Sequence, residues 1–175
     1  KHLSAYLGVS KIIWLNRGIY NDETNGHVDN ICCLIRPGVV ALAWTDDKSD
    51  PQYEISAENY EILRSATDAK GHRLEIHKIQ LPAPIHITEE ESRGVLAVDG
   101  TLPRNPGDRL AASYINFYFC NGGVVMPTFN DPHDALALSQ LQALMPDRAV
   151  VGVYAREILL GGGNIHCITQ QVPSI

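Results

Sequence analysis

Apolar and polar residues follow one another in the first half of the chain in a pattern typical of strands joined by a tight turn. Two apolar runs, at residues 31–35 and 39–44, flank the Arg-Pro-Gly sequence at residues 36–38. Pro-Gly pairs favour turns, and short apolar runs between turn signals are typical of buried strands, so we predict a β-hairpin. Apolar residues at helical spacing over 53–66 and a period-two alternation at 74–79 then predict a helix and a third strand.

The same order of elements returns in the second half of the chain. Apolar runs at residues 114–119 and 124–126 flank an Asn-Gly-Gly turn, a helical pattern covers 135–144, and an apolar run covers 149–154. The chain is therefore expected to be α/β, with two ββαβ units at about residues 30–80 and 113–155 and partial units at both ends. One such unit cannot bury both faces of its sheet, so we expect several units around a common axis, as parts of a larger ring.

The remaining segments carry weaker signals. The apolar run at residues 12–15 predicts a buried strand, and the polar residues 20–26 predict a loop. Residues 82–108 contain several prolines and glycines and are expected to form a long loop, whereas residues 157–169 begin another unit. Residues 1–7 look like the last turn of a helix; because the sequence starts with Lys, we expect a fragment.

Charge and composition exclude several classes of partner. The 175 residues include 14 Lys and Arg against 20 Asp and Glu, a net charge of −6, which would repel nucleic acid and anionic bilayers. No apolar run approaches the ~18 residues of a membrane span, so we expect a cytoplasmic protein. The acidic run at residues 89–91 is expected to be solvated.

The four cysteines form no CxxC pair, which indicates reduced thiols. Cys32, Cys33 and Cys120 are interpreted as core residues. The seven histidines show no HxxxH or HExxH spacing, and His166 would point away from its neighbour Cys167 in a strand. No metal site is therefore expected.

Cys167 is the candidate nucleophile because it follows three glycines, 161–163, which can bring a substrate close to the main chain. A thiolate nucleophile requires a base and an orienting group. His27 and Asp29 could supply them, since residues two apart in an extended segment project from the same face. The alternatives are a buried cysteine in a terminal strand and a solvated loop histidine beside a capping aspartate. A cysteine protease is also compatible with these residue types.

Four segments, at residues 21–30, 36–47, 111–118 and 161–171, resemble the agmatine deiminase family. The third reads Ala-Ala-Ser-Tyr-Ile-Asn-Phe-Tyr, and the fourth reads Gly-Gly-Gly-Asn-Ile-His-Cys-Ile-Thr-Gln-Gln. This resemblance implies a pentein fold, a five-unit α/β propeller of ββαβ repeats. Residues 1–175 would form about half of that ring, the C-terminal half of a single domain.

The resemblance implies that Cys167 attacks the guanidinium carbon of agmatine, that His27 acts as general acid and base, and that Asp29 binds the guanidinium nitrogens. Agmatine and water would yield N-carbamoylputrescine and ammonia, a step towards putrescine and the polyamines. The reaction would pass through a covalent amidino-cysteine and require neither metal nor organic cofactor.

Two alternatives to this function stay open. The substrate could be arginine or peptidyl-arginine, or the chain could be a catalytically incomplete structural or binding module. The further carboxylates that the family places in its N-terminal half are absent from these residues. We therefore expect the isolated chain to bind agmatine weakly, and to associate with the missing half or with itself as a homo-oligomer.

Overall fold

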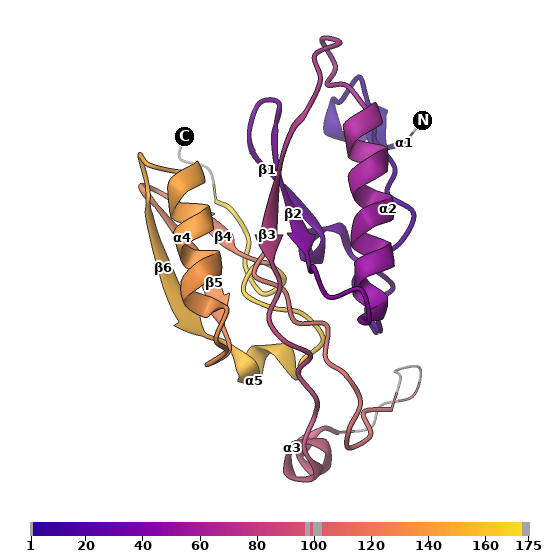
Figure 1. Cartoon of the computed structure of the whole chain (residues 1–175), viewed down its shortest axis with the longest axis vertical. Helices are drawn as coiled ribbons and strands as arrows, with labels where there is room; N and C mark the ends of the chain where they lie inside the picture. Colours follow the sequence, from indigo (N-terminus) through magenta and orange to yellow (C-terminus); the bar gives the residue numbers. More distant parts are fainter. Residues whose placement is uncertain (1, 97–98, 100–102, 173–175) are drawn as a thin grey trace.

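Two three-stranded sheets organise the chain, each with a long helix beside it, in a computed structural model (Figure 1). The structure describes residues 2–96, 99 and 103–172; Lys1 and parts of the predicted 82–108 loop lie outside this range. The elements are α1 (His2–Leu7), η1 (Val28–Asn30), β1 (Cys32–Arg36), β2 (Val39–Trp44), α2 (Pro51–Ser65), β3 (Glu75–Gln80), α3 (Glu89–Gly94), β4 (Tyr118–Cys120), β5 (Gly123–Thr128), α4 (Asp134–Leu144), β6 (Ala149–Tyr154) and α5 (Arg156–Leu159).

The two sheets have the same topology. In the first, β1 runs antiparallel to β2, and β2 runs parallel to β3 after the α2 crossover. In the second, β4 pairs with β5 in the antiparallel sense and β5 pairs with β6 in the parallel sense, with α4 between them. The α/β class and the predicted hairpin are confirmed. Gly38 closes the first hairpin with φ 78°, a conformation that glycine adopts without strain.

One hydrophobic core joins both units. Every residue of β2 is buried, because this strand lies between β1 and β3 and is covered by α2. Helix α4 packs against β6 and also contacts β3 of the first sheet. The Gln140 side chain of α4 accepts a hydrogen bond from the backbone N–H of Gln80 at 3.0 Å, so the helix of the second unit covers the edge of the first sheet.

Two predicted strands are wrong in whole or in part. Residues 12–15 form no strand in the described chain, and Trp14 is 71% exposed. Of the predicted strand 114–119, only its end belongs to β4, although Tyr114 and Phe117 are fully buried. The apolar run therefore reflects burial rather than a strand. Periodicity does not separate these two cases when the run is short.

The predicted 82–108 loop contains the short helix α3, at the end of an excursion away from the two sheets (Figure 1). A capping box starts this helix: the Glu91 carboxylate accepts from the backbone N–H of Thr88 at 2.7 Å, and Thr88 Oγ1 accepts from the N–H of Glu91 at 3.2 Å. Glu91 is not solvated as predicted, because Arg156 of α5 binds its carboxylate at 2.5 Å.

One further prediction from the sequence is wrong. Cys120 is exposed rather than part of the core, because it lies at the end of the short strand β4. The segment predicted to begin another unit contains the end of helix α5 and a series of turns. In contrast, Cys32 and Cys33 pack against the core as expected, and burial raises their thiol pKa values to about 12 and about 11. Among the described residues, no helix is long and apolar enough to cross a bilayer.

We predict that Glu91→Gln lowers the free energy of unfolding by about 1–2 kcal/mol at pH 7. The hydrogen bond from Arg156 holds the pKa of Glu91 at about 2, below its ordinary value of 4.5. Because the pKa of Glu91 is lower in the folded chain than in the unfolded chain, the ionised carboxylate stabilises the fold fully above pH 4.5. This stabilisation is lost as the pH falls towards 2. Urea titrations across this pH range should show the free energies of unfolding of the variant and of the unsubstituted chain converging as the pH falls. Glu90→Gln, at an exposed neighbour, is the matched control, and an equal loss there would contradict the ion-pair account.

Candidate active site

Cys167 lies in a turn that follows α5 and the three glycines, and not in a terminal strand, which was the alternative considered for it. Two of these glycines are required by close approaches of the chain. Gly162 has φ 91°, and a Cβ there would lie 2.8 Å from Glu23 and Arg104, which form an ion pair with each other. A Cβ on Gly163 would lie 2.7 Å from the Cys167 sulfur. The glycines therefore let the main chain pass its own thiol and the ion pair.

Asn116 holds the turn that carries the thiol. Its side chain is fully buried, and its Oδ1 accepts from the backbone N–H groups of His166 at 2.9 Å and Cys167 at 3.3 Å. Its Nδ2 donates to the Cys167 sulfur at 3.1 Å and to Oδ1 of Asn30 at 2.9 Å. One amide thus links the Cys167 turn to helix η1, which lies before the first sheet.

Asp29 of η1 places a carboxylate beside the thiol. Its Oδ2 accepts from Cys167 Sγ at 3.2 Å and lies 2.7 Å from Nδ1 of His166. Its Oδ1 is buried and has no hydrogen-bond partner in the described structure. The prediction that His166 points away from Cys167 is wrong, because neighbouring residues of a turn can face the same group. The unpaired Oδ1 is an acceptor without a donor, which favours a cationic or N–H-rich ligand.

The Cys167 thiol has a pKa above its ordinary value of 9.0. Desolvation of the sulfur is the largest cause, even though the residue as a whole is exposed, and the Asp29 carboxylate adds to it. Hydrogen bonds from Asn164 and Asn116 act in the opposite direction. The thiol is therefore mainly protonated at neutral pH. A cation bound to Asp29 would offset the carboxylate charge and favour the thiolate.

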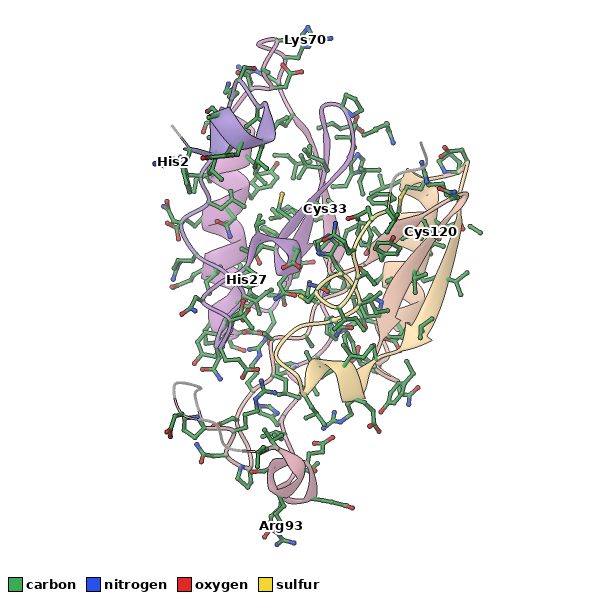
Figure 2. The ribbon with its side chains drawn as sticks, turned by 180° about the vertical axis from the view of Figure 1, so that it is seen from behind. His2, His27, Cys33, Lys70, Arg93 and Cys120 are labelled. Carbon is green, nitrogen blue, oxygen red and sulfur yellow. The ribbon has the colours of Figure 1, made fainter. Side chains whose placement is uncertain are left out.

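His27 lies at the N-terminal end of η1, with its backbone N–H donating to Asp22 at 3.1 Å. The residue, labelled in Figure 2, is exposed. Its imidazole forms no hydrogen bond within the described residues. Because Asp29 is in a 3₁₀ helix, the predicted extended segment with both side chains on one face is wrong. The structure brings Asp29 to Cys167, whereas the His27 side chain bonds to none of the residues that the structure describes.

The loop before His27 is held by a close backbone approach. The Asp22 carboxylate accepts from Thr24 and from the N–H of His27, an Asx-type turn that orders the polar loop. A Cβ on Gly18 would lie 2.2 Å from the Cα of Gly26, so the two ends of this loop touch through main-chain atoms. The position of His27 therefore depends on the absence of a side chain at Gly18.

The sequence interpretation missed Asn116, Asn30 and His166 as parts of this site. A signal for Asn116 was present, because it is a polar residue inside the aromatic run at 114–119. A buried amide requires partners, so such a residue indicates a hydrogen-bonded site. Nothing comparable marks His166. In the part of the chain that the structure describes, no three His, Cys, Asp or Glu side chains are grouped as metal ligands.

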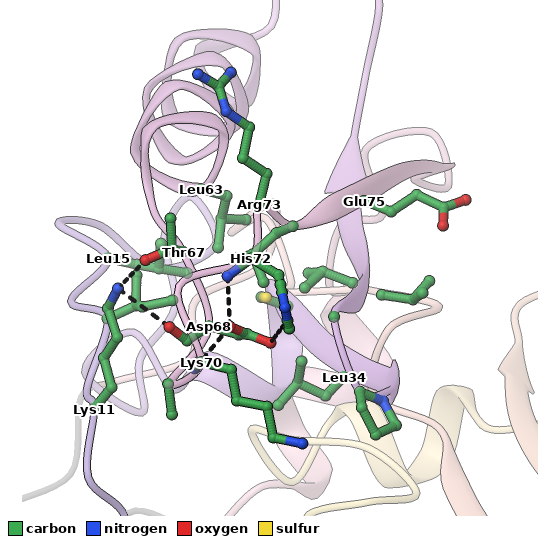
Figure 3. Close-up of a pocket in the computed structure, with 18 of the residues that line it drawn as sticks. Lys11, Leu15, Leu34, Leu63, Thr67, Asp68, Lys70, His72, Arg73 and Glu75 are labelled. Carbon is green, nitrogen blue, oxygen red and sulfur yellow. Dashed lines mark hydrogen bonds and ion pairs between the residues drawn. The ribbon is translucent and has the colours of Figure 1, made fainter.

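A pocket of about 860 Å³ lies on another side of η1, between the N-terminal segment, β1 and the connection from α2 to β3 (Figure 3). Its lining includes apolar side chains such as Leu15, Leu34 and Leu63. Four of its polar side chains are bonded in pairs: Lys11 donates to Thr67, and His72 pairs with Asp68. Cys167 does not line this pocket, so the reactive groups and the pocket are separate features.

A family model described as Porphyromonas-type peptidyl-arginine deiminase matches residues 1–173. A Listeria monocytogenes protein named "Putative agmatine deiminase 1" is 70% identical over 171 residues, which cover 98% of this chain and 47% of that protein. The agmatine deiminase of Pseudomonas aeruginosa is 55% identical over 172 residues, which cover 98% of this chain and 47% of that protein. The chain spans about half the length of the curated relatives it matches.

Solved structures agree with these relatives. The agmatine deiminase of Enterococcus faecalis superposes with a TM-score of 0.91 at 46% identity, over 98% of this chain and 47% of that chain. A Porphyromonas gingivalis protein named "Putative Arginine Deiminase" superposes with a TM-score of 0.83 at 28% identity. The match covers 98% of this chain and 45% of that chain.

We predict that Asp29→Asn makes Cys167 more reactive. Removing the carboxylate charge beside the sulfur should lower the thiol pKa and speed alkylation by iodoacetamide at pH 7 by about three- to tenfold. Peptide mass spectrometry resolves each cysteine, and the exposed Cys120 is an internal reference. Slower alkylation of Cys167 in the variant would mean that Asp29 acts as a base for the thiol.

We predict that Gly18→Ala lowers the free energy of unfolding by about 1–3 kcal/mol, because the new methyl group collides with the main chain of Gly26. Thermal unfolding followed by circular dichroism measures this loss. Gly94→Ala is the matched control, since a Cβ there meets nothing within 4 Å. Equal melting temperatures for the two variants would contradict the role of the close approach.

Proposed function

Because this chain belongs to the family of Porphyromonas-type peptidyl-arginine deiminases, we propose that it forms the nucleophile-bearing half of an agmatine deiminase. The complete enzyme would convert agmatine and water to N-carbamoylputrescine and ammonia. The observation that carries the proposal is the Cys167 sulfur 3.2 Å from Oδ2 of Asp29, whose other oxygen is buried and has no hydrogen-bond partner among the described residues. A guanidinium group offers N–H donors and a positive charge, which match that oxygen and the charge of the carboxylate.

The proposed reaction has two stages. With the guanidinium held by Asp29, the Cys167 thiol gives its proton to His27, and the thiolate attacks the guanidinium carbon and forms a C–S bond; a C–N bond then breaks, and ammonia leaves with the proton from His27. Water, deprotonated by His27, then attacks the same carbon. A C–O bond forms, the C–S bond breaks, and the thiolate is restored with N-carbamoylputrescine as the product.

The substrate itself supports thiolate formation in this scheme. The thiol pKa is raised by desolvation and by the Asp29 charge, so the free site holds a protonated sulfur. A guanidinium bound to Asp29 offsets that charge and lowers the thiol pKa. The nucleophile would therefore be activated only when the cation is present, which limits reaction of the exposed sulfur with other electrophiles.

His27 is assigned the acid–base role on the strength of the resemblance. Its imidazole is exposed and has no hydrogen bond within the described chain, so no contact must break for it to approach a substrate on Cys167. His166, whose Nδ1 lies 2.7 Å from Asp29, is the other imidazole at the site. We assign it to holding the carboxylate, because its ring nitrogen is already engaged there.

Arginine or peptidyl-arginine is the second candidate substrate. It is favoured by the description of the family model and by the arginine deiminase among the structural neighbours. Agmatine is preferred because the relatives bearing that name share 55–70% of their residues with this chain, against 28% for that neighbour. The α-carboxylate of arginine is the main chemical difference between the two substrates, and an acidic site disfavours it.

The catalytic unit is proposed to need a second partner, either the missing half of the ring or another copy of this chain. Asp29 supplies one carboxylate, whereas a desolvated guanidinium requires pairing on more than one side. The edge strand β6 also exposes apolar side chains, with Val151 54% and Tyr154 48% exposed. Such a surface is typical of an interface that is covered in a larger assembly.

The test is ammonia release from agmatine by this chain mixed with the N-terminal half of the Listeria relative. We predict turnover in the mixture, at least about a thousandfold slower turnover by the isolated chain, and none by Cys167→Ala or Cys167→Ser mixtures. Cys120→Ser is the matched control and should leave turnover unchanged. Activity that persists in both Cys167 variants would overturn the nucleophile assignment.

The same assay with arginine and a peptidyl-arginine substrate decides between the candidate substrates. Turnover of either one above that of agmatine would overturn the agmatine assignment. A mixture that binds agmatine but releases no ammonia would identify the chain as a binding module instead.

A further inference from the structure

We propose that Asn116 is a positioning residue of this site: its amide fixes the turn that carries Cys167 and donates a hydrogen bond to the sulfur that favours the thiolate. The expected effect of Asn116 on catalysis rests on the proposed function. The hydrogen bonds themselves belong to the free chain. Neither the family resemblance nor the sequence pattern assigns a role to this residue.

The Asn116 amide uses its whole hydrogen-bonding capacity. Its oxygen accepts from two backbone N–H groups, at 2.9 Å and 3.3 Å, and its two N–H groups donate to Asn30 at 2.9 Å and to Cys167 Sγ at 3.1 Å. Rotating the amide by 180° would set its N–H donors against two further N–H donors. The orientation is therefore determined by the network, and the sulfur faces a donor.

Burial makes this network sensitive to substitution. Asn116 and Asn30 are almost completely buried, so the hydrogen bond between them forms without competition from water, and the bonds from Asn116 to the Cys167 turn are partly buried. Asn116 also accepts through its backbone carbonyl from the N–H of His166 at 3.2 Å. The residue thus binds the turn by both its main chain and its side chain, and Asn30 connects it to the element that carries Asp29.

The charges around the sulfur explain why a donor is needed there. Among the described residues, Asp29 and His166 are the titratable groups hydrogen-bonded to the thiol or to its carboxylate neighbour, and Cys33 also lies near Asp29. The carboxylate and desolvation both disfavour the thiolate. Asn116 is the side chain whose hydrogen bond opposes them, and a hydrogen bond to a charged acceptor is stronger than one to a neutral acceptor.

The experiment measures the pH dependence of Cys167 alkylation by iodoacetamide in the 175-residue chain. Asn116→Ala and Asn116→Asp both remove the N–H donor, and Asn116→Asp retains an acceptor for the two backbone N–H groups. We expect the half-maximal alkylation rate at higher pH in both variants, with about tenfold slower alkylation at pH 7. Asn59→Ala is the matched control, since this buried amide donates to Arg17 and not to the Cys167 turn.

Folding defects are separated from the proposed role by a measurement on the unsubstituted chain. Hydrogen exchange should show slow exchange of the His166 and Cys167 amides, which donate to Asn116, and faster exchange of Ile168 in the same turn. Unprotected His166 and Cys167 amides would overturn the proposal. So would native circular dichroism with an unchanged pH profile in either Asn116 variant.

The outcome is also distinct from that of the functional test, because alkylation needs no agmatine. A shifted thiol profile without ammonia release in the mixed halves would support the role of Asn116 and contradict the deiminase assignment. Ammonia release with an unshifted profile would overturn the Asn116 role alone.

Discussion

The structure of the site depends on the contact between the Cys167 turn and helix η1. This contact joins residues 138 positions apart through the Asp29–Cys167 hydrogen bond, with Asn116 and Asn30 between the two segments. Ordering such distant segments costs chain entropy, and these hydrogen bonds alone would not offset it. The shared core of the two sheets provides the remainder, because Ile31, next to η1, and Leu159 of α5 both belong to it. The site is thus a consequence of how the two units pack.

The same dependence explains which features could be predicted from the sequence. The hairpin around Gly38, helix α2 and strand β6 depend on local periodicity and turn residues, and the structure confirms them. The irregular segment at 114–117 and the Cys167 turn are defined by partners far away in the sequence. Helix α3 had a local signal, the Thr88–Glu91 capping box, but the surrounding prolines and glycines outweighed it. Cys167 and Asp29 were found by residue type, whereas their contact was not.

The electrostatics of the site oppose its proposed chemistry in the absence of substrate. Desolvation and the Asp29 carboxylate both raise the thiol pKa, so the resting sulfur is a poor nucleophile. The same carboxylate is the group that a guanidinium would bind. A site that suppresses its nucleophile until a cation arrives selects for cationic substrates at the chemical step as well as at binding. The Asn116 donor limits how far the thiol pKa rises.

The two sheets differ in whether a helix covers their parallel edge strand. This difference bears on where another unit could pack. The β3 edge is covered by α4, whose Gln140 bonds the main chain at Gln80 and at Lys78. The β6 edge has no equivalent cover in the described chain, and its exposed valines lie on the strand that leads to α5 and the Cys167 turn. If each unit covers the edge of the one before it, β6 is the edge that a following unit would cover. Such a unit would pack beside the segment that carries Cys167, in agreement with the second partner that the proposed function requires.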